Sequence, residues 1–145
     1  MINDVITSEH NDCLVVTETW FDNSVVYSDI LPDGYDIHLQ NRVGKRGGGI
    51  AVIFSKSLSV KCELPTQFSS FERTIITLLN VKPAIRLVGV YRPPGNKCSQ
   101  DFVSDMLSLL QNCNNSVCTP AIVDDFNKHV QNATNAFCKG SLISI

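Results

Sequence analysis

Ile122-Val123-Asp124-Asp125-Phe126-Asn127 is a short apolar run that ends in two carboxylates and an amide. Side-chain oxygens at the end of a strand are suited to holding a hard cation and a phosphate. Two earlier apolar runs end in a comparable way, the first in Thr17-Glu18-Thr19-Trp20 and the second in Tyr91-Arg92-Pro93-Pro94. The sequence therefore predicts three β-strands that each carry a chemically capable group at the end.

The composition is that of one soluble globular domain. The chain has 145 residues, of which 43% are hydrophobic and 18% charged, enough to build a core. No apolar run approaches the roughly 20 residues of a membrane span, and the acidic opening segment is unlike a secretory signal. We therefore expect an intracellular protein with no membrane partner. The net charge of −2 means that any nucleic-acid binding must depend on a local patch.

The six cysteines are scattered, and none forms the C-x-x-C pair that is typical of zinc or redox sites. We expect free thiols. Cys113 and Cys118 are close enough in sequence to meet across a loop, but a disulfide there would need an oxidising compartment.

Hydrophobic periodicity predicts a layered α/β sandwich whose middle strands are antiparallel. One helix is expected over residues 2–10. A second is expected over residues 100–111, with Ser99 as its N-cap, and its apolar stripe is formed by Phe102, Val103, Met106, Leu107 and Leu110. Strands are expected at residues 13–17, 35–39, 50–54, 60–62, 74–79, 85–91 and 121–123.

Four motifs give the chain a resemblance to a known family. They are Thr17-Glu18-Thr19-Trp20-Phe21, Arg46-Gly47-Gly48-Gly49-Ile50-Ala51, Tyr91-Arg92-Pro93-Pro94, and Asp125-Phe126-Asn127 with His129. Their order and wording resemble the endonuclease/exonuclease/phosphatase superfamily, and within it the apurinic-type endonuclease domains of non-LTR (LINE-like) retrotransposons. Those domains carry T-E-T-W-L, R-G-G-G-V-A, Y-R-P-P and G-D-F-N-x-H. The match runs from about Asp12 to His129 and leaves residues 130–145 as a tail of uncertain role.

The resemblance implies a fold, a reaction and a setting. The fold is a four-layer α/β/β/α sandwich of the DNase-like kind, formed here by residues 1–145 as a single partial domain. The reaction is the hydrolysis of a DNA phosphodiester with Mg²⁺ or Mn²⁺. The parent polypeptide would include a reverse transcriptase domain, and the protein would act in the nucleus.

The same resemblance assigns roles to individual residues. Glu18 is similar to the metal-binding glutamate, a suitable hard ligand. Asp125 and Asn127 resemble the pair that orients water and holds the phosphate, and Tyr91 would donate a hydrogen bond nearby. Glu72 resembles a supporting acidic position. The open alternatives are an Asx turn at the aspartate and asparagine, an exposed glutamate, and an ordinary strand tyrosine.

Basic residues near the motifs are candidates for DNA contacts: Arg42, Lys45, Arg46 and Arg92. A solvated basic turn is the alternative for the first three. The neighbouring glycines do not form a P-loop, because the run lacks the G-x-x-x-x-G-K-[ST] spacing and precedes a strand.

Three departures from the family pattern predict impaired activity. Asp124 occupies the family's glycine position and would bring a second negative charge beside the metal site. The family's first strand, with its asparagine, has no counterpart before Asp12, and the closing Ser-Asp-His segment is absent from the 145 residues. We therefore expect an N- and C-terminally incomplete domain. A non-catalytic remnant with weak DNA binding and a phosphatase-type member of the superfamily are the alternatives.

Overall fold

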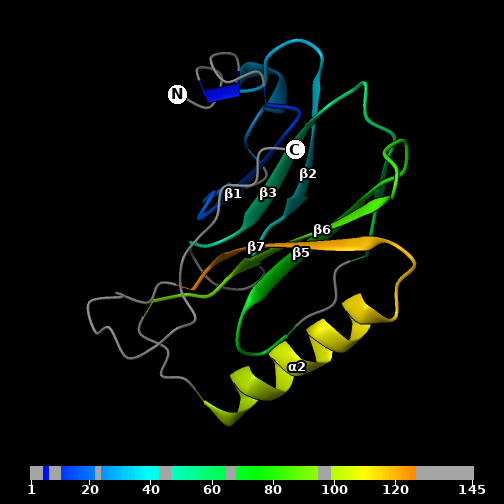
Figure 1. Cartoon of the computed structure of the whole chain (residues 1–145). Helices are drawn as coiled ribbons and strands as arrows, with labels where there is room; N and C mark the ends of the chain where they lie inside the picture. The colour runs from blue at the N-terminus through cyan, green and yellow to red at the C-terminus, as the bar shows by residue number, and fades with distance from the viewer. Residues whose placement is uncertain are drawn as a thin grey trace.

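The structure is a computed structural model that describes residues 5–6, 11–21, 24–42, 47–64, 68–94 and 99–126 (Figure 1). Several expectations lie outside these residues. They concern Lys45, Arg46, Asn127, His129, the tail 130–145 and most of the first helix, of which Val5 and Ile6 are described as helical.

The first sheet has three antiparallel strands in the order β1-β3-β2. Its central strand β3 is buried along nearly its whole length, as its uninterrupted apolar sequence predicts. A 3-10 turn, η1 (Tyr27–Asp29), lies between β1 and β2. The strands are β1 (Cys13–Thr17), β2 (Tyr35–Gln40) and β3 (Ile50–Ser55).

The second sheet has four strands in the order β4-β5-β6-β7. The first three are antiparallel, as expected, and β7 is parallel to β6. A parallel pair needs a crossover, and helix α2 (Gln100–Asn114) supplies it. The strands are β4 (Val60–Cys62), β5 (Glu72–Leu78), β6 (Ile85–Tyr91) and β7 (Thr119–Asp125).

The last strand is longer than its apolar residues indicate. The sequence predicts residues 121–123, but the parallel ladder with β6 continues to the pair Tyr91 and Asp125. Both aspartates therefore lie within the strand and not in a turn after it.

Two apolar clusters separate three layers, and Figure 1 shows α2 along the outer side of the second sheet. Between the sheets, Val52 and Phe54 pack with Ile76, Leu78 and Leu87. On the other face of the second sheet, α2 contributes Leu109 and Cys113, and β5 and β6 contribute Ile75, Val88 and Val90. The expectation of an α/β sandwich is confirmed.

The apolar stripe expected on α2 is only partly correct. Phe102 and Met106 pack on the core, as expected. The same side of the helix also carries Leu109 and Cys113, which are buried in that core. The other three expected residues, Val103, Leu107 and Leu110, are exposed by 47%, 54% and 38%. The sheet contacts a face offset from the most apolar one, because the crossover fixes the helix's rotation. Ser99 caps the helix as expected by accepting a hydrogen bond from the Phe102 amide at 3.2 Å.

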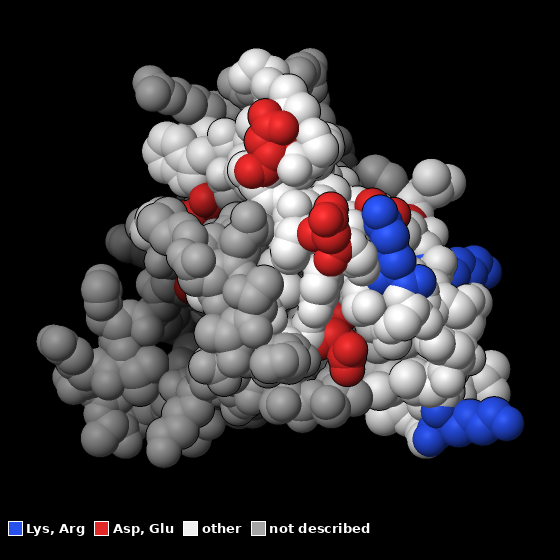
Figure 2. All heavy atoms as spheres, turned by 90° about the horizontal axis from the view of Figure 1, so that it is seen from above, with Lys and Arg blue, Asp and Glu red and all other residues white. Residues whose placement is uncertain are grey.

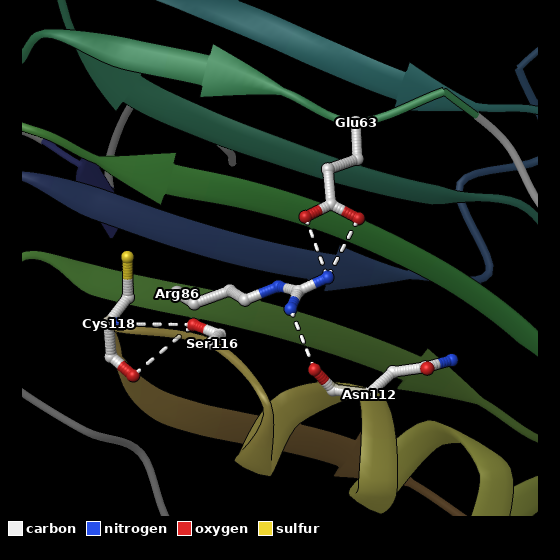
Figure 3. A network of polar contacts seen from close by, with 5 residues as sticks. All are labelled: Glu63, Arg86, Asn112, Ser116 and Cys118. Carbon is white, nitrogen blue, oxygen red and sulfur yellow. Dashed lines mark hydrogen bonds and ion pairs between the residues drawn. The ribbon is translucent and has the colours of Figure 1, made fainter.

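A polar network fastens the C-terminal end of α2 to the second sheet (Figure 3). Arg86 of β6 donates through Nη2 to Glu63 at 2.9 Å and through Nη1 to the Asn112 carbonyl at 3.0 Å. A cation at the last carbonyls of a helix satisfies acceptors that lack helical partners. Next to it, Ser116 Oγ accepts a hydrogen bond from the Cys118 amide at 3.0 Å. These contacts hold the turn that leads into β7.

Among the described residues, no helix is both long enough and apolar enough to cross a membrane. The four cysteines that the structure describes are free thiols, as expected, and they include Cys113 and Cys118.

Candidate functional site

Two hydrogen bonds join the sheets at one rim of the sandwich. Thr17 Oγ1, at the end of β1, donates to Asp125 Oδ2 at 3.1 Å. The hydroxyl of Tyr91, at the end of β6, donates to Glu18 Oε1. Tyr91 and Asp125 are also direct partners in the parallel ladder. Glu18, Tyr91 and Asp125 therefore lie at the same rim, as the sequence predicts.

Tyr91 combines a buried ring with a hydroxyl that reaches an exposed carboxylate. Only 2% of the residue is exposed, whereas Glu18 is exposed. Burial, followed by the hydrogen bond to Glu18, raises the pKa of Tyr91 above its ordinary value. The hydroxyl thus stays protonated at neutral pH, where it can serve as a hydrogen-bond donor.

The backbone around Glu18 has an uncommon conformation. Glu18 and Trp20 both have φ of 54°, in the left-handed region that non-glycine residues rarely occupy. Such conformations cost about 1–3 kcal/mol each and persist only where surrounding contacts enforce them. Here the Trp20 amide donates to the Gly48 carbonyl at 3.0 Å, and the Thr19 amide to the Gly49 carbonyl at 3.4 Å.

The glycine run is therefore a support for the Thr17-Glu18-Thr19-Trp20 motif. Gly49 has φ of +90°, and a Cβ added to it would lie 2.6 Å from Thr19 Oγ1. The two motifs are neighbours because β1 and β3 are paired, with Thr17 opposite Ile50. This explains physically why glycines precede β3.

Glu72 connects this support to the second sheet. Its Oε2 accepts a hydrogen bond from the Gly49 amide at 2.7 Å, and its Oε1 accepts one from Arg42 Nε. Glu72 is also the ladder partner of Tyr91. Its position next to the candidate site agrees with the supporting role that the resemblance implies, which remains a prediction.

The two described arginines that the sequence offers for DNA contacts have other neighbours. Arg42 is paired with Glu72, and its guanidinium lies 5.9 Å from the centre of the Tyr91 ring. Arg92 is 2% exposed, and its guanidinium lies 4.4 Å from the Phe102 ring of α2. A DNA contact by Arg92 stays a prediction, and in this structure its guanidinium is buried against the Phe102 ring.

Asp124 also lies on a different side from the one expected. Side chains alternate along a strand, and Ile122 belongs to the cluster beneath α2 whereas Val123 packs between the sheets. Asp124 thus faces α2, and Asp125 faces the first sheet. Burial, and secondarily the charge of Asp125, raises the pKa of Asp124. Its charge is not directed at Glu18.

The carboxylates at the rim suit a Mg²⁺ ion that keeps most of its water ligands better than one surrounded by protein ligands. Within the described ranges, no three His, Cys, Asp or Glu side chains gather closely enough to surround a metal. Mg²⁺ commonly keeps several waters and takes only one or two carboxylates from the protein. The exposed carboxylate of Glu18 fits that requirement.

Charge is mixed on the upper face of the molecule, in the orientation of Figure 1. Figure 2, a view from above, shows separate acidic side chains and a few basic ones on the described part of that face, without a continuous basic stripe. A pocket of about 420 Å³ lies elsewhere, beside β2 and η1, and shares no residue with the rim.

One contributor to the rim was not identified from the sequence, namely Thr17. Its hydroxyl bonds to Asp125, yet the sequence offered it only as the last residue of a strand. Its place directly before Glu18 in the motif was the available signal.

No family model and no curated protein matches this sequence, but solved structures do. The structure is similar to a humanized D. rerio TDP2, with a TM-score of 0.63 and 13% identity over 88% of this chain and 54% of that one. ANGEL2, a 2',3'-cyclic phosphatase, gives a TM-score of 0.63 and 19% identity over 87% of this chain and 42% of that one. The human Nocturnin catalytic domain with bound sulfate gives a TM-score of 0.55 and 15% identity over 85% of this chain and 54% of that one.

The chain spans about half the length of the solved structures that it matches. At these identities the likeness concerns the fold alone. The chain therefore has the two-sheet α/β fold of these structures.

Proposed function

We propose that this chain carries part of the catalytic rim of a Mg²⁺- or Mn²⁺-dependent phosphodiester hydrolase that acts on DNA. The observation that supports this most is the pair of contacts between the sheets, Tyr91 to Glu18 and Thr17 to Asp125. They gather a carboxylate open to solvent, a neutral hydroxyl donor and a second carboxylate at one rim. Phosphodiester hydrolysis needs these groups together.

Each residue has a distinct task in this proposal. Glu18 holds the cation, which supplies charge neutralisation at the phosphate when bound. Asp125 orients the attacking water and accepts its proton, and its hydrogen bond from Thr17 fixes the carboxylate. Tyr91, protonated at neutral pH, has one hydroxyl proton, which it donates to Glu18 in this structure; in the proposal that donation moves to a phosphate oxygen when cation and substrate bind. Asn127, outside the described residues, is proposed to donate its amide to the same phosphate.

The biological setting is a further part of the proposal. The order and wording of the four motifs support a retrotransposon origin of the LINE-like kind. The parent polypeptide would then include a reverse transcriptase and would act on nuclear DNA. The parts of the proposal that concern the site do not depend on this origin.

A phosphatase is the second candidate, because a neighbour of the same fold is described as a 2',3'-cyclic phosphatase. The deciding test uses activated substrates. A nitrophenolate departs without a proton donor, so hydrolysis of methyl p-nitrophenyl phosphate depends mainly on the cation and the water. The corresponding monoester is p-nitrophenyl phosphate.

We expect the chain to hydrolyse the diester in Mn²⁺ or Mg²⁺, and to lose this activity in Glu18→Gln and in Asp125→Asn. Asp33→Asn, an exposed carboxylate in the turn before β2, is the matched control and should keep it. Hydrolysis of the monoester alone would favour the phosphatase. The absence of metal-dependent hydrolysis of either substrate would identify a non-catalytic remnant.

A further inference from the structure

Trp20 is the one tryptophan of the chain, and it is exposed to solvent by 59%. Exposed tryptophans are uncommon, because a large apolar ring loses free energy in contact with water. Its position is also specific, two residues after Glu18. Two residues span at most about 7 Å, so the backbone of Trp20 lies close to that of Glu18.

The ring is held in place. The left-handed backbone at Trp20 is fixed by its amide hydrogen bond to the Gly48 carbonyl at 3.0 Å. Beneath it, a Cβ added to Gly47 would lie 3.3 Å from the indole, so the ring packs closely over a residue without a side chain. A surface that is ordered before binding loses less conformational entropy when a ligand arrives.

We propose that Trp20 is a stacking platform for an unpaired nucleobase next to the phosphate held at Glu18. This inference rests on the proposed function and extends it to the form of the substrate, which is a single-stranded or locally opened nucleic acid. Aromatic side chains stack on any base, because every base has a π face.

Electrostatics favours the same conclusion. The chain has a net charge of −2, and Arg42 and Arg92 are engaged by Glu72 and Phe102. Phosphate contacts usually supply most of the affinity for nucleic acid. Base stacking on Trp20 would add affinity to the phosphate contacts proposed for Lys45 and Arg46, which lie outside the described residues.

The experiment uses the tryptophan fluorescence of the chain, excited at wavelengths that its three tyrosines do not absorb, so that the signal reports on Trp20 alone. The wild-type chain is titrated with a single-stranded oligonucleotide and with an abasic oligonucleotide of equal length. We expect strong quenching by the first and little by the second. Dissociation constants are measured independently from the anisotropy of labelled oligonucleotides.

Stacking on an aromatic side chain predicts that Trp20→Ala weakens oligonucleotide binding about 5- to 150-fold. Trp20→Phe, which keeps a smaller ring, should retain part of the affinity. Leu64→Ala is the matched control, because Leu64 is an exposed apolar residue (87%) outside the rim. It should bind like the wild type.

The proposal is overturned if the oligonucleotide does not quench, if the abasic strand quenches equally, or if Trp20→Ala binds normally. Quenching by proteins and not by oligonucleotides would reassign the ring to a protein partner. Base-dependent quenching without diester hydrolysis would refute the proposed function and leave the platform standing. Hydrolysis together with binding that is independent of Trp20 would refute the platform alone.

Discussion

At the scale of single residues, the chemistry of the rim depends on which face of a strand each side chain occupies. Asp124 and Asp125 are adjacent and chemically identical, yet one faces α2 and the other accepts a hydrogen bond from Thr17. Tyr91, one strand away, has a buried ring and a hydroxyl at Glu18. Such differences lead to predictions that titration can check.

Tyr91→Phe should destabilise the chain at pH 7 by about 1 kcal/mol, because it removes one hydrogen bond.

The raised pKa of Tyr91 leads to a second prediction, on the pH dependence of stability. The protonated Tyr91 hydroxyl contributes its full stabilisation below a pH of about 10, the pKa of tyrosine in the unfolded chain. This stabilisation is lost as the pH rises above that value. In urea unfolding from pH 8 to 11, the wild type should lose more stability than Tyr91→Phe. Equal losses would mean that the hydroxyl ionises freely.

Asp124→Asn should raise the melting temperature at pH 7. The pKa of Asp124 is raised, so its protonated form is favoured by folding and its ionised form costs stability at neutral pH. The gain should disappear as the pH falls below about 4, the ordinary range of an aspartate. Asp33→Asn, at an exposed turn, should show no such pattern. A loss of stability at pH 7 would indicate that the Asp124 carboxylate has a stabilising partner.

At the scale of elements, the site is assembled by pairing strands that are distant in sequence. β1 and β3 bring the Glu18 turn onto the glycine run. The pairing of β5 with β6 sets Glu72 beside Tyr91, and Glu72 in turn holds the Gly49 amide. A substitution in the glycine run should therefore disturb the conformation of the turn at Glu18.

Gly49→Ala and Gly34→Ala form a matched pair that isolates this effect. Both glycines have left-handed backbone, with φ of +90° and +87°, but only a Cβ at Gly49 meets Thr19, at 2.6 Å. The backbone penalty is about 1–2 kcal/mol for each, and overpacking adds about 1–3 kcal/mol at Gly49. Chemical denaturation should show the larger loss for Gly49→Ala. Equal losses of stability would mean that the Thr19 side chain moves away from the added Cβ at little cost in free energy.

Glu72→Ala should cost about 1–3 kcal/mol, because it leaves the Gly49 amide and the Arg42 guanidinium without their acceptor. Glu72→Gln keeps an acceptor oxygen and should cost less. Thermal unfolding of both variants checks the order. If the two variants were equally stable, the contacts of Glu72 would contribute little to the rim.

At the scale of the whole molecule, hydrolysis of unactivated DNA is the most demanding test. The 145 residues contain no Ser-Asp-His segment, and groups that act as a unit lose most of their effect when one is missing. We expect no nicking of supercoiled plasmid above background by this chain, even with Mg²⁺. Nicking that requires Mg²⁺ and is lost in both Glu18→Ala and Asp125→Ala would show that another residue manages the charge on the phosphate.

The elements and their order could be predicted from the sequence, because hydrophobic periodicity and caps act locally. The boundaries of β1, β4 and β6 are those expected, and Ser99 caps α2. The motif order also indicated a DNase-like α/β sandwich, and the likeness to the solved structures confirms that fold. The convergence of Glu18, Tyr91 and Asp125 was implied by the resemblance to the superfamily, and the contacts at the rim agree with it.

The contacts of individual side chains depend on how the sheets and the helix pack together. The full length of β7, the core-facing side of α2 and the burial of Arg92 depend on partners far away in sequence. The same is true of the hydrogen bond from Thr17 to Asp125, which spans 108 positions. Local sequence carries no information about such contacts, because they arise when two sheets and a crossover helix fix one another's register and rotation.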